Sequence, residues 1–408
     1  MKKTSDLILI ILPDGPVAFD GKYYRYSKGE RLYLDNLAKD FKEIHLATFV
    51  VKEGEQFYDS LIHSKFESDN IFIKELPKPL SREPGVLGKA FQFLLVFLRL
   101  ILLTRKADVG YLFLPSYPSA MAWISLKLWR KPHIVYGADD WVQASESMFK
   151  WPDKKESLLY KNYAKLNFSM EKNIVSSALF SVAAGGQLIE KYKNYGCYSY
   201  PTSPRMTLSS SNIYNREDTC NGKIITIVNV GSLIHDKAQH ILIEAFAIAS
   251  NRYPNLKLKI IGEGPEKKNL TQLADKLKVI DKIIFQGYVE EESILYEHLR
   301  NSDIFALSSL TEGFPRVLYE AMCMRLPIVT TDVGGIPYLL FNEKNALVVK
   351  SGDIEQLARS LILIIENNDL RKGIIREANR TIDDVFKRMD GSQIAKLLTK
   401  HSAPQNND

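Results

Sequence analysis

The sequence predicts an α/β protein built from two doubly wound domains, each a parallel sheet covered by helices. Apolar strand-like runs alternate with amphipathic helical runs along the whole chain, which is the pattern of parallel sheets wrapped by helices. With 408 residues, the chain also exceeds the size that a single hydrophobic core usually covers. A polar, turn-rich stretch separates two such alternating halves, which indicates two domains.

Five short apolar runs in the N-terminal half are of the buried-strand type. They are Leu7–Leu12, Ile44–Val50, Val109–Leu114, Ile134–Tyr136 and Ala178–Ala184. Helices are expected over about Gly29–Asp40 and Ser119–Trp129, and after Gly185-Gly186. This order of strands and helices is the one expected of a parallel sheet.

The longest apolar run of the chain is Ala90–Leu103, which Arg99 interrupts. It is shorter than the roughly 20 residues needed to cross a bilayer. We therefore expect a core helix of the first domain. A helix that touches a membrane surface is the alternative interpretation.

The C-terminal half repeats the strand–helix alternation. Its strand-type runs are Ile224–Val230, Leu256–Ile261, Ile283–Phe285, Asp303–Leu307 and Leu326–Thr330, and its clearest helices are Ala238–Ala249 and Ile354–Ile365. We predict an N-terminal domain over 1–200, a linker over 201–222 and a C-terminal domain over 223–390. Residues 391–408 are expected to form a helix and tail that packs back on the N-terminal domain.

Composition restricts the class of protein. Hydrophobic residues make up 45% and charged residues 25%, which is typical of globular domains. Three cysteines without metal-site spacing indicate a reduced, cytoplasmic chain. The formal net charge of +6 falls entirely within residues 1–200. This basic N-terminal half can attract anionic lipid or a phosphate-bearing molecule. Its lysines are dispersed, which argues against binding of nucleic acid.

Three loops that follow C-terminal strands contain residues suited to an anionic ligand. In the first, Gly231 and Ser232 begin a turn that ends at Lys237, where a cation and a helix start favour phosphate. In the second, Gly262 and Gly264 permit close approach of a ligand to the backbone, although a simple strand-to-helix turn explains them equally well.

The third loop precedes a helix expected to begin at Pro315, a residue that suits the first helical turn. Glu312 would then lie before the helix and Glu320 about one and a half turns into it. Glu312 is suited to accept hydrogen bonds from sugar hydroxyls, and Glu320 is suited to hold a vicinal diol such as a ribose. Two glutamates on a solvated helix are the simpler alternative.

The order of these motifs resembles the retaining glycosyltransferases of family 4, also called group 1. The motifs are G-S-L…K, I-G-E-G-P, Q-G-Y-V, S-S-L-T-E-G-F-P-x-V-L-x-E-A-M and P-I-V-T-T-D-V-G-G-I-P, between about Ile224 and Asp353. The resemblance implies the GT-B fold of two Rossmann-like domains. It implies an N-terminal domain that binds the acceptor and a C-terminal domain that binds a nucleotide sugar, with UDP the expected carrier.

The resemblance also implies residue roles. Glu312 would contact the transferred sugar, Glu320 the nucleotide ribose and Lys237 the phosphates, so Glu312 and Lys237 are the candidate catalytic residues. The other candidate donor-binding residues are Gly231, Ser232, Gly262, Tyr288, Gly313, Phe314, Pro315, Arg316 and Gly335. On the acceptor side the candidates are Asp139 and Gly29.

Two positions depart from the family pattern. Ser232 stands where arginine is common, and Arg316 is a candidate to replace that positive charge. No histidine follows the strand at Ile134–Tyr136, because His133 lies at its start; Asp139 is the nearest substitute, and helix capping explains it equally well.

The chain contains no Asp-x-Asp motif, so neither a required metal nor another cofactor is expected. The predicted partners are a nucleotide sugar and a glycan or polyprenyl-diphosphate-linked acceptor of bacterial surface-polysaccharide synthesis. The expected location is cytoplasmic, with possible peripheral attachment at the inner face of the cell membrane. A non-catalytic nucleotide-sugar-binding subunit and another GT-B enzyme, such as an epimerase, stay open as alternatives.

Overall fold

A computed structural model describes residues 3–13, 15–55, 58–61, 64–78, 86–138, 140–141, 158–202, 208, 212–312, 315–389 and 393–402. The chain divides into two compact units. The N-terminal unit comprises Met1–Thr207 and Arg388–Asp408, and the C-terminal unit comprises Leu208–Lys387. The division at 207/208 falls inside the expected 201–222 linker.

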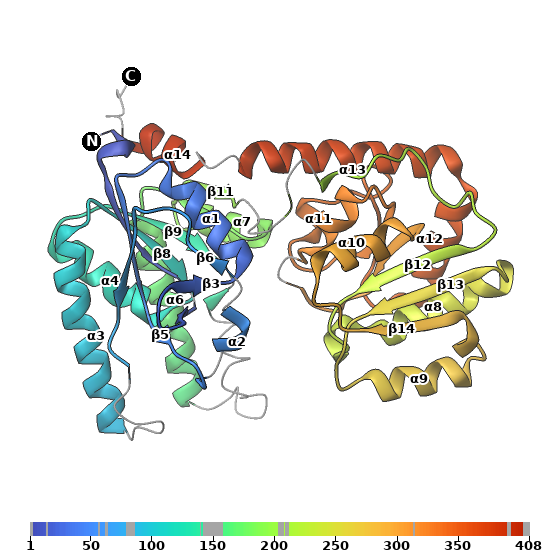
Figure 1. Cartoon of the computed structure of the whole chain (residues 1–408), viewed down its shortest axis with the longest axis horizontal. Helices are drawn as coiled ribbons and strands as arrows, with labels where there is room; N and C mark the ends of the chain where they lie inside the picture. Colours follow the sequence, from blue (N-terminus) through green and yellow to red (C-terminus); the bar gives the residue numbers. More distant parts are fainter. Residues whose placement is uncertain are drawn as a thin grey trace. The chain divides into compact units, whose positions relative to one another are not determined.

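The N-terminal unit contains a seven-stranded sheet in the order β11-β10-β9-β8-β1-β4-β7 (Figure 1), and every described strand pair in it is parallel. Its strands are β1 (Ile8–Leu12), β4 (Glu43–Thr48), β7 (Ile71–Glu75), β8 (Val109–Leu114), β9 (His133–Gly137), β10 (Ser181–Ala183) and β11 (Ser199–Pro201). All five strands predicted for this half are present. The parallel order puts their carboxyl ends at one edge of the sheet.

Side chains of the central strands alternate between two hydrophobic cores, one on each face of this sheet. In β1, Leu9 and Ile11 belong to one core, whereas Ile10 and Leu12 belong to the other. Helices α1 (Lys28–Ala38) and α14 (Gln393–Ser402) cover the first face. Helices α3 (Val86–Lys106), α4 (Tyr117–Leu128), α6 (Leu158–Ser176) and α7 (Gly186–Asn194) cover the second. Ile394 and Leu398 of α14 are buried in the first core, so this helix is part of the N-terminal unit.

A small second sheet in the N-terminal unit was not predicted. It has the order β5-β2-β3-β6 and is formed by β2 (Val17–Phe19), β3 (Tyr24–Tyr26), β5 (Val50–Val51) and β6 (Ser64–Lys65). Its strands are two or three residues long, too short to produce a detectable alternation of polar and apolar residues. The short helices η1 (Thr4–Asp6) and α2 (Tyr58–Leu61) complete the unit.

Helix α3 differs from the expected core helix. It runs over 21 residues, and the span Leu87–Lys106 has the length and apolar composition of a membrane-crossing helix, with only 22% of its apolar window buried. Its inner face is nonetheless part of the fold, because Val96, Leu100 and Leu103 lie in the second core. The prediction of a core helix is therefore wrong for the outer face, where apolar side chains are exposed. Those most exposed are Leu87, Phe91, Phe93, Leu94, Leu98 and Leu102.

The C-terminal unit contains a six-stranded sheet in the order β14-β13-β12-β15-β16-β17, again with parallel pairs throughout. Its strands are β12 (Ile225–Val230), β13 (Leu256–Ile261), β14 (Ile283–Gly287), β15 (Ile304–Leu307), β16 (Ile328–Thr331) and β17 (Leu347–Val349). The order reverses beside β12, since β13 lies on one side of it and β15 on the other. Doubly wound sheets bind ligands at such a point, outside the carboxyl ends of the strands.

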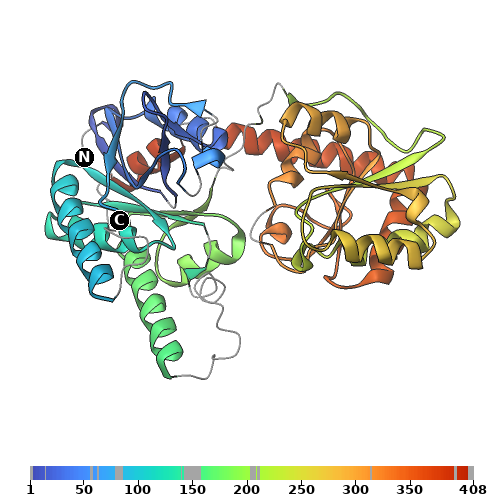
Figure 2. The same ribbon diagram turned by 60° about the horizontal axis from the view of Figure 1, so that its bottom comes forward.

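Helices cover both faces of this second sheet (Figure 2). One face packs against α8 (Gln239–Arg252), α9 (Lys267–Lys276), α12 (Ile354–Glu366) and part of α13 (Asn368–Met389), which share one core. Helices α10 (Glu292–Arg300) and α11 (Val317–Cys323) contribute nothing to that core and cover the other face. Three single-turn helices, η4 (His235–Lys237), η5 (Ile280–Lys282) and η6 (Ile336–Tyr338), lie in connecting loops.

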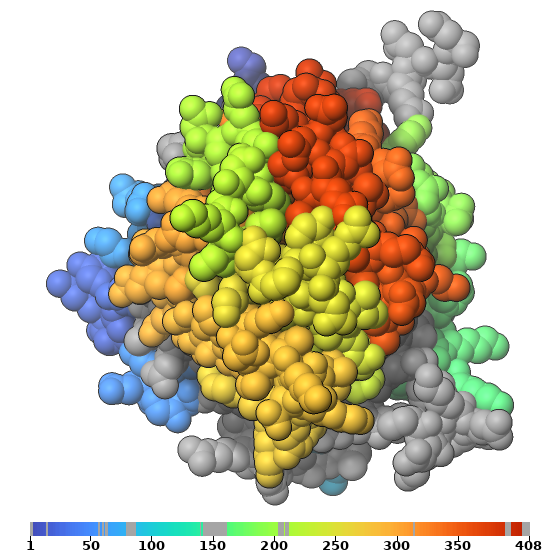
Figure 3. All heavy atoms as spheres, turned by 90° about the vertical axis from the view of Figure 1, so that its right-hand side faces the viewer, coloured from blue at the N-terminus to red at the C-terminus, as the bar shows by residue number. Residues whose placement is uncertain are grey.

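Residues 212–222, which were predicted as linker, are bound to the C-terminal unit. The Arg216 guanidinium donates to the carbonyl oxygens of Met324 at 2.9 Å and Ser302 at 2.9 Å. Asp218 accepts from Arg371 at 2.7 Å and 3.1 Å, and the Arg371 side chain is only 1% exposed. Figure 3 shows this yellow-green segment beside the red surface of α13.

Candidate functional site

The first candidate loop follows β12 at the reversal point of the C-terminal sheet. Gly231 leaves the strand, the single turn η4 ends at Lys237, and α8 begins two residues later. Ala238 between them has φ +48°, an uncommon left-handed conformation for a residue other than glycine. This sharp turn sets Lys237 just ahead of a 14-residue helix.

The loop after β15 is fastened to this first loop by hydrogen bonds. The Ser308 hydroxyl donates to the Ala238 carbonyl at 2.9 Å, and the Leu310 N–H donates to the Asp236 carbonyl at 2.8 Å. Thr331, at the end of β16, donates its hydroxyl to the Ser309 carbonyl at 2.8 Å. Three neighbouring strand ends are thereby held together, and the positions of their side chains are fixed.

Lys237 and Glu312 meet across these two loops. The Lys237 ammonium lies 2.7 Å from each carboxylate oxygen of Glu312, and the Ser309 hydroxyl donates to Glu312 Oε1, also at 2.7 Å. The Glu312 side chain is 7% exposed and that of Lys237 is 26% exposed. The two residues predicted to be catalytic therefore form one half-buried ion pair. Sequence analysis assigned no role to Ser309, which orients the carboxylate.

Glu320 lies in the first turn of α11. This differs from the prediction, because the helix begins at Val317 rather than at Pro315, and Pro315 precedes it. Burial raises the pKa of Glu320 to about 7, the negative charge of Glu292 adds to that shift, and Arg316 opposes it. Within the described part of the chain, no hydrogen-bond or ion-pair partner contacts this half-buried carboxylate. It is thus free to accept hydrogen bonds from a ligand.

Gly262 and Gly264 have a structural role that the sequence did not reveal. A Cβ at Gly262, where φ is +145°, would lie 2.0 Å from the Gly231 carbonyl oxygen. A Cβ at Gly264 would lie 2.3 Å from that of Leu233. Both glycines therefore make room for the backbone of the first loop. The sequence had suggested that they make room for a ligand. The Leu233 N–H donates to the Glu263 carbonyl at 2.9 Å, so the two loops support each other.

The other candidate residues of the C-terminal unit also follow sheet strands. Tyr288 comes directly after β14 and is 74% exposed, so its ring is available for stacking. Gly335 precedes η6 in the loop after β16. Ser232 and Arg316 are exposed. Gly313 and Phe314 lie outside the described residues.

On the acceptor side, Gly29 lies in the first turn of α1, and Asp139 lies outside the described residues. The neighbouring Asp140 accepts from Lys191 at 2.6 Å, and the same ammonium donates to the buried Glu171 at 2.6 Å. His133 is buried at the start of β9, at the edge opposite the strand's carboxyl end. Burial lowers its pKa to about 4, and its ring Nε2 lies 2.9 Å from the Ile174 carbonyl oxygen.

No group of three or more His, Cys, Asp or Glu side chains suited to a metal ion occurs in the part of the chain that the structure describes. The expectation that no metal is required therefore stays a prediction. The positive charge available to a phosphate in this unit comes from side chains such as Lys237 and Arg316.

Comparison with known proteins finds similarity to glycosyltransferases in the C-terminal unit. A family model described as Glycosyl transferases group 1 matches residues 213–381, which include all of the strand ends described above. An uncharacterized glycosyltransferase of Haemophilus influenzae is 35% identical over 146 residues, which are 36% of this chain and 40% of that protein. The lipopolysaccharide core biosynthesis glycosyltransferase LpsE of Rhizobium meliloti is 30% identical over 162 residues, 40% of this chain and 46% of that protein. The matches thus cover less than half of each relative.

The fold is that of solved GT-B structures. HepE of Anabaena, solved in complex with UDP, aligns with a TM-score of 0.67 over 97% of this chain and 100% of that one, at 17% identity. The same protein was also solved with UDP-glucose, with a TM-score of 0.63. The predicted architecture of two Rossmann-like parallel-sheet domains is confirmed.

Proposed function

We propose that this chain, whose residues 213–381 match the family model for group 1 glycosyl transferases, transfers a sugar from a UDP-sugar to an acceptor in bacterial surface-polysaccharide synthesis. The observation that supports the proposal most directly is the Lys237–Glu312 pair at the reversal point of the C-terminal sheet. It is followed on α11 by the Glu320 carboxylate, for which the described residues provide no partner. An ammonium for phosphate and two acceptors for hydroxyl groups are the chemistry that a nucleotide sugar requires.

In this proposal each side chain has one task. Lys237 faces the diphosphate oxygens, where charge accumulates as the sugar leaves. Glu312 accepts hydrogen bonds from hydroxyl groups of the transferred sugar, and Glu320 accepts from the two ribose hydroxyls. Tyr288 offers its exposed ring to the uracil. HepE, which shares the fold, was solved with UDP and with UDP-glucose, and this favours uridine as the base.

We propose transfer with retention of configuration. The acceptor oxygen attacks the anomeric carbon on the face from which the diphosphate departs, the bond from that carbon to the phosphate oxygen breaks, and the acceptor proton passes to the departing phosphate. Lys237 stabilises the diphosphate, and Glu312 holds the sugar so that the attacked carbon stays in place. Side-chain cations supply the positive charge, so no metal ion is required.

The acceptor is proposed to be lipid-linked. The outer face of α3 exposes a row of apolar side chains, and Lys89, Arg99, Arg105 and Lys106 are exposed on the same helix. Apolar residues with flanking cations favour the surface of an anionic membrane. LpsE and other relatives are named for lipopolysaccharide core, colanic acid and teichuronic acid biosynthesis.

The test is release of UDP from a panel of UDP-sugars, with and without membrane extracts that contain acceptor. The wild-type protein should release UDP from one sugar donor, and release should rise with extract. Glu312→Gln should bind the donor and release little UDP. If the wild type binds UDP-sugars but releases no UDP under any condition, a non-catalytic nucleotide-sugar-binding subunit replaces the enzyme as the conclusion.

A further inference from the structure

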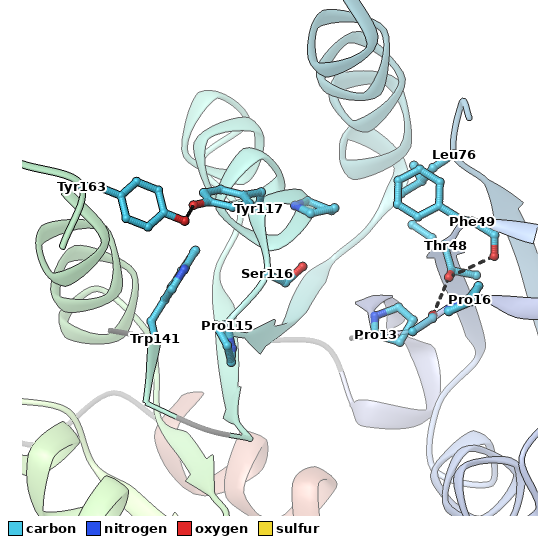
Figure 4. A pocket seen from close by; sticks show the side chains of 13 residues that line it. Pro13, Pro16, Thr48, Phe49, Leu76, Pro115, Ser116, Tyr117, Trp141 and Tyr163 are labelled. Atoms are coloured by element: carbon cyan, nitrogen blue, oxygen red, sulfur yellow. Dashed lines mark hydrogen bonds between the residues drawn. The ribbon is translucent and has the colours of Figure 1, made fainter. Parts of the chain in front are cut away.

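A cavity of about 260 Å³ opens at the carboxyl edge of the N-terminal sheet. Its walls come from segments that follow β1, β4, β7, β8 and β9 and from α4 and α6. The lining residues used below are Phe49, Leu76, Ser116, Tyr117, Trp141 and Tyr163. Figure 4 shows an aromatic wall of Tyr117, Trp141 and Tyr163, and a second wall that includes Phe49, Leu76 and two prolines. Nothing in the donor chemistry requires this cavity.

The lining is uncharged and mostly hydrocarbon. Among the described residues that line the cavity, none carries a carboxylate or a basic side chain. An apolar pocket with a few polar groups is the usual form of a small-molecule site. A diphosphate, a uronic acid or any other charged group would lose its hydration against these described walls without gaining a counter-ion, so they favour an uncharged ligand.

The hydroxyl groups of the walls already have partners in the protein. Tyr117 and Tyr163 share a hydrogen bond of 2.6 Å between their hydroxyls, and Thr48 donates to the Gly15 carbonyl at 2.8 Å. The Ser116 hydroxyl caps α4 by accepting from the Ser119 N–H. A sugar ring needs partners for several hydroxyl groups, and walls whose described hydroxyls mostly bond within the protein favour a hydrocarbon ligand.

Aromatic rings connect the cavity to the exposed face of α3. The Phe93 ring, 47% exposed on that helix, stands edge-on to Tyr117 with ring centres 6.3 Å apart. Tyr117 in turn contacts Trp141, with ring centres 5.8 Å apart. A continuous row of aromatic contacts therefore links the exposed face of α3 to the lining of the cavity.

We propose that this cavity binds a segment of the isoprenyl or alkyl chain of a lipid-linked acceptor, which enters along the exposed apolar row of α3. The proposal rests on the transferase function inferred above and names the chemical class of its acceptor. The cavity anchors the chain and holds the attached polar group near the carboxyl edge of the N-terminal sheet.

The test is photolabelling of the full-length protein with a diazirine derivative of farnesol, an uncharged isoprenoid alcohol, followed by peptide mapping. Labels are expected on the peptides that contain Phe49, Leu76 and Tyr117, and excess farnesol should protect them while excess methyl glucoside should not. Phe49→Glu places a charge at a half-buried wall position and should reduce labelling of Tyr117 about tenfold. Phe72→Glu, at an aromatic residue 40% exposed outside the lining, should leave labelling unchanged.

Labelling confined to the outer face of α3, or protection by methyl glucoside, would overturn the proposal, and the wild-type map decides this even if Phe49→Glu fails to fold. UDP is titrated against the same samples. Loss of cavity labelling with intact UDP binding rejects only the chain-binding cavity. Cavity labelling without any UDP binding rejects the transferase function on which it rests.

Discussion

Lys237 and Glu312 are bound to each other at 2.7 Å, by both carboxylate oxygens, although 75 residues separate them in the sequence. The pair means that the cation proposed for the diphosphate is neutralised before a donor arrives. A nucleotide must therefore compete with Glu312 for the ammonium, or share it. Removing the charge of Glu312 should therefore strengthen UDP binding, whereas removing a binding residue usually weakens it.

Replacing Glu312 with glutamine should separate nucleotide binding from transfer. Glutamine keeps the size of the side chain and removes its charge, so Lys237 becomes fully available to phosphate. The affinity for UDP should rise roughly fivefold, equivalent to about 1 kcal/mol. Turnover should fall about 10²- to 10³-fold, because the sugar loses an acceptor used in the transition state. Calorimetry with UDP and a UDP-release assay measure the two effects. A fall in UDP affinity would show that Glu312 assists phosphate binding instead.

Binding of UDP should depend on pH through Glu320. Burial raises the pKa of this carboxyl to about 7. Below that pH the group is protonated and loses acceptor capacity for the ribose hydroxyls; above it the carboxylate accepts from both. Affinity should therefore fall as pH drops from 8 to 6, with a limiting slope of about tenfold per pH unit for one coupled proton.

The matched variant for this pH dependence is Glu320→Gln, which cannot ionise. Its UDP affinity should be weaker at pH 8 and nearly constant between pH 6 and 8. A wild-type affinity that is flat across this range, or a Glu320→Gln variant that keeps the slope, would contradict the role given to Glu320.

The buried Arg371–Asp218 pair should stabilise the C-terminal unit. Arg371 also donates to the carbonyl oxygens of Ile364 and Ile365, each at 2.9 Å. Arg371→Ala would leave Asp218 without its main partner and should lower the free energy of unfolding by about 3–5 kcal/mol. Lys372→Ala is the control, because its ammonium is 4.0 Å from Asp218 on a side chain that is 54% exposed. The Lys372→Ala variant should change the denaturation midpoint very little. Equal effects of the two variants would show that the Arg371–Asp218 pair does not stabilise the unit.

The outer face of α3 should bind anionic vesicles. Leu94 and Leu98 are 51% and 49% exposed, and replacing both with serine removes apolar area from the proposed contact. Sedimentation with phosphatidylglycerol vesicles at low salt should weaken at least about tenfold, since each leucine contributes roughly 1.5 kcal/mol or more when buried. Ile294→Ser on α10, 43% exposed in the other unit, is the control. Equal sedimentation of all three proteins would show that the outer face of α3 does not bind the vesicles.

The sequence predicts long, strongly patterned elements well. Val109–Leu114 and Leu256–Ile261 coincide with β8 and β13, because buried parallel strands read as continuous apolar runs bounded by turns. The residue at which a helix begins is harder to predict from the sequence. Pro315 suggested the first turn of α11, but the helix begins at Val317, so Glu320 moves into its first turn.

Contacts between distant residues are beyond sequence patterns. The Arg371–Asp218 pair joins residues 153 positions apart, and neither lies in a recognisable motif. The outer face of α3 was expected in the core because its composition is apolar, whereas only one side of the helix meets the sheet. The cavity beside it is assembled from several separate segments, each unremarkable alone.

The central claim is that the C-terminal unit binds a uridine nucleotide through Lys237. Isothermal titration of UDP into the wild type, Lys237→Ala and Lys257→Ala tests it most directly. Lys257 is the control because it lies near the start of β13, at the opposite edge of the same sheet, where it donates to the Asp281 carbonyl at 3.0 Å. Lys237→Ala should bind UDP about 10- to 100-fold more weakly, the loss of a hydrogen bond between charged groups, and Lys257→Ala should bind as the wild type does. Equal binding by all three proteins, or no binding of UDP to the wild type, would contradict the account.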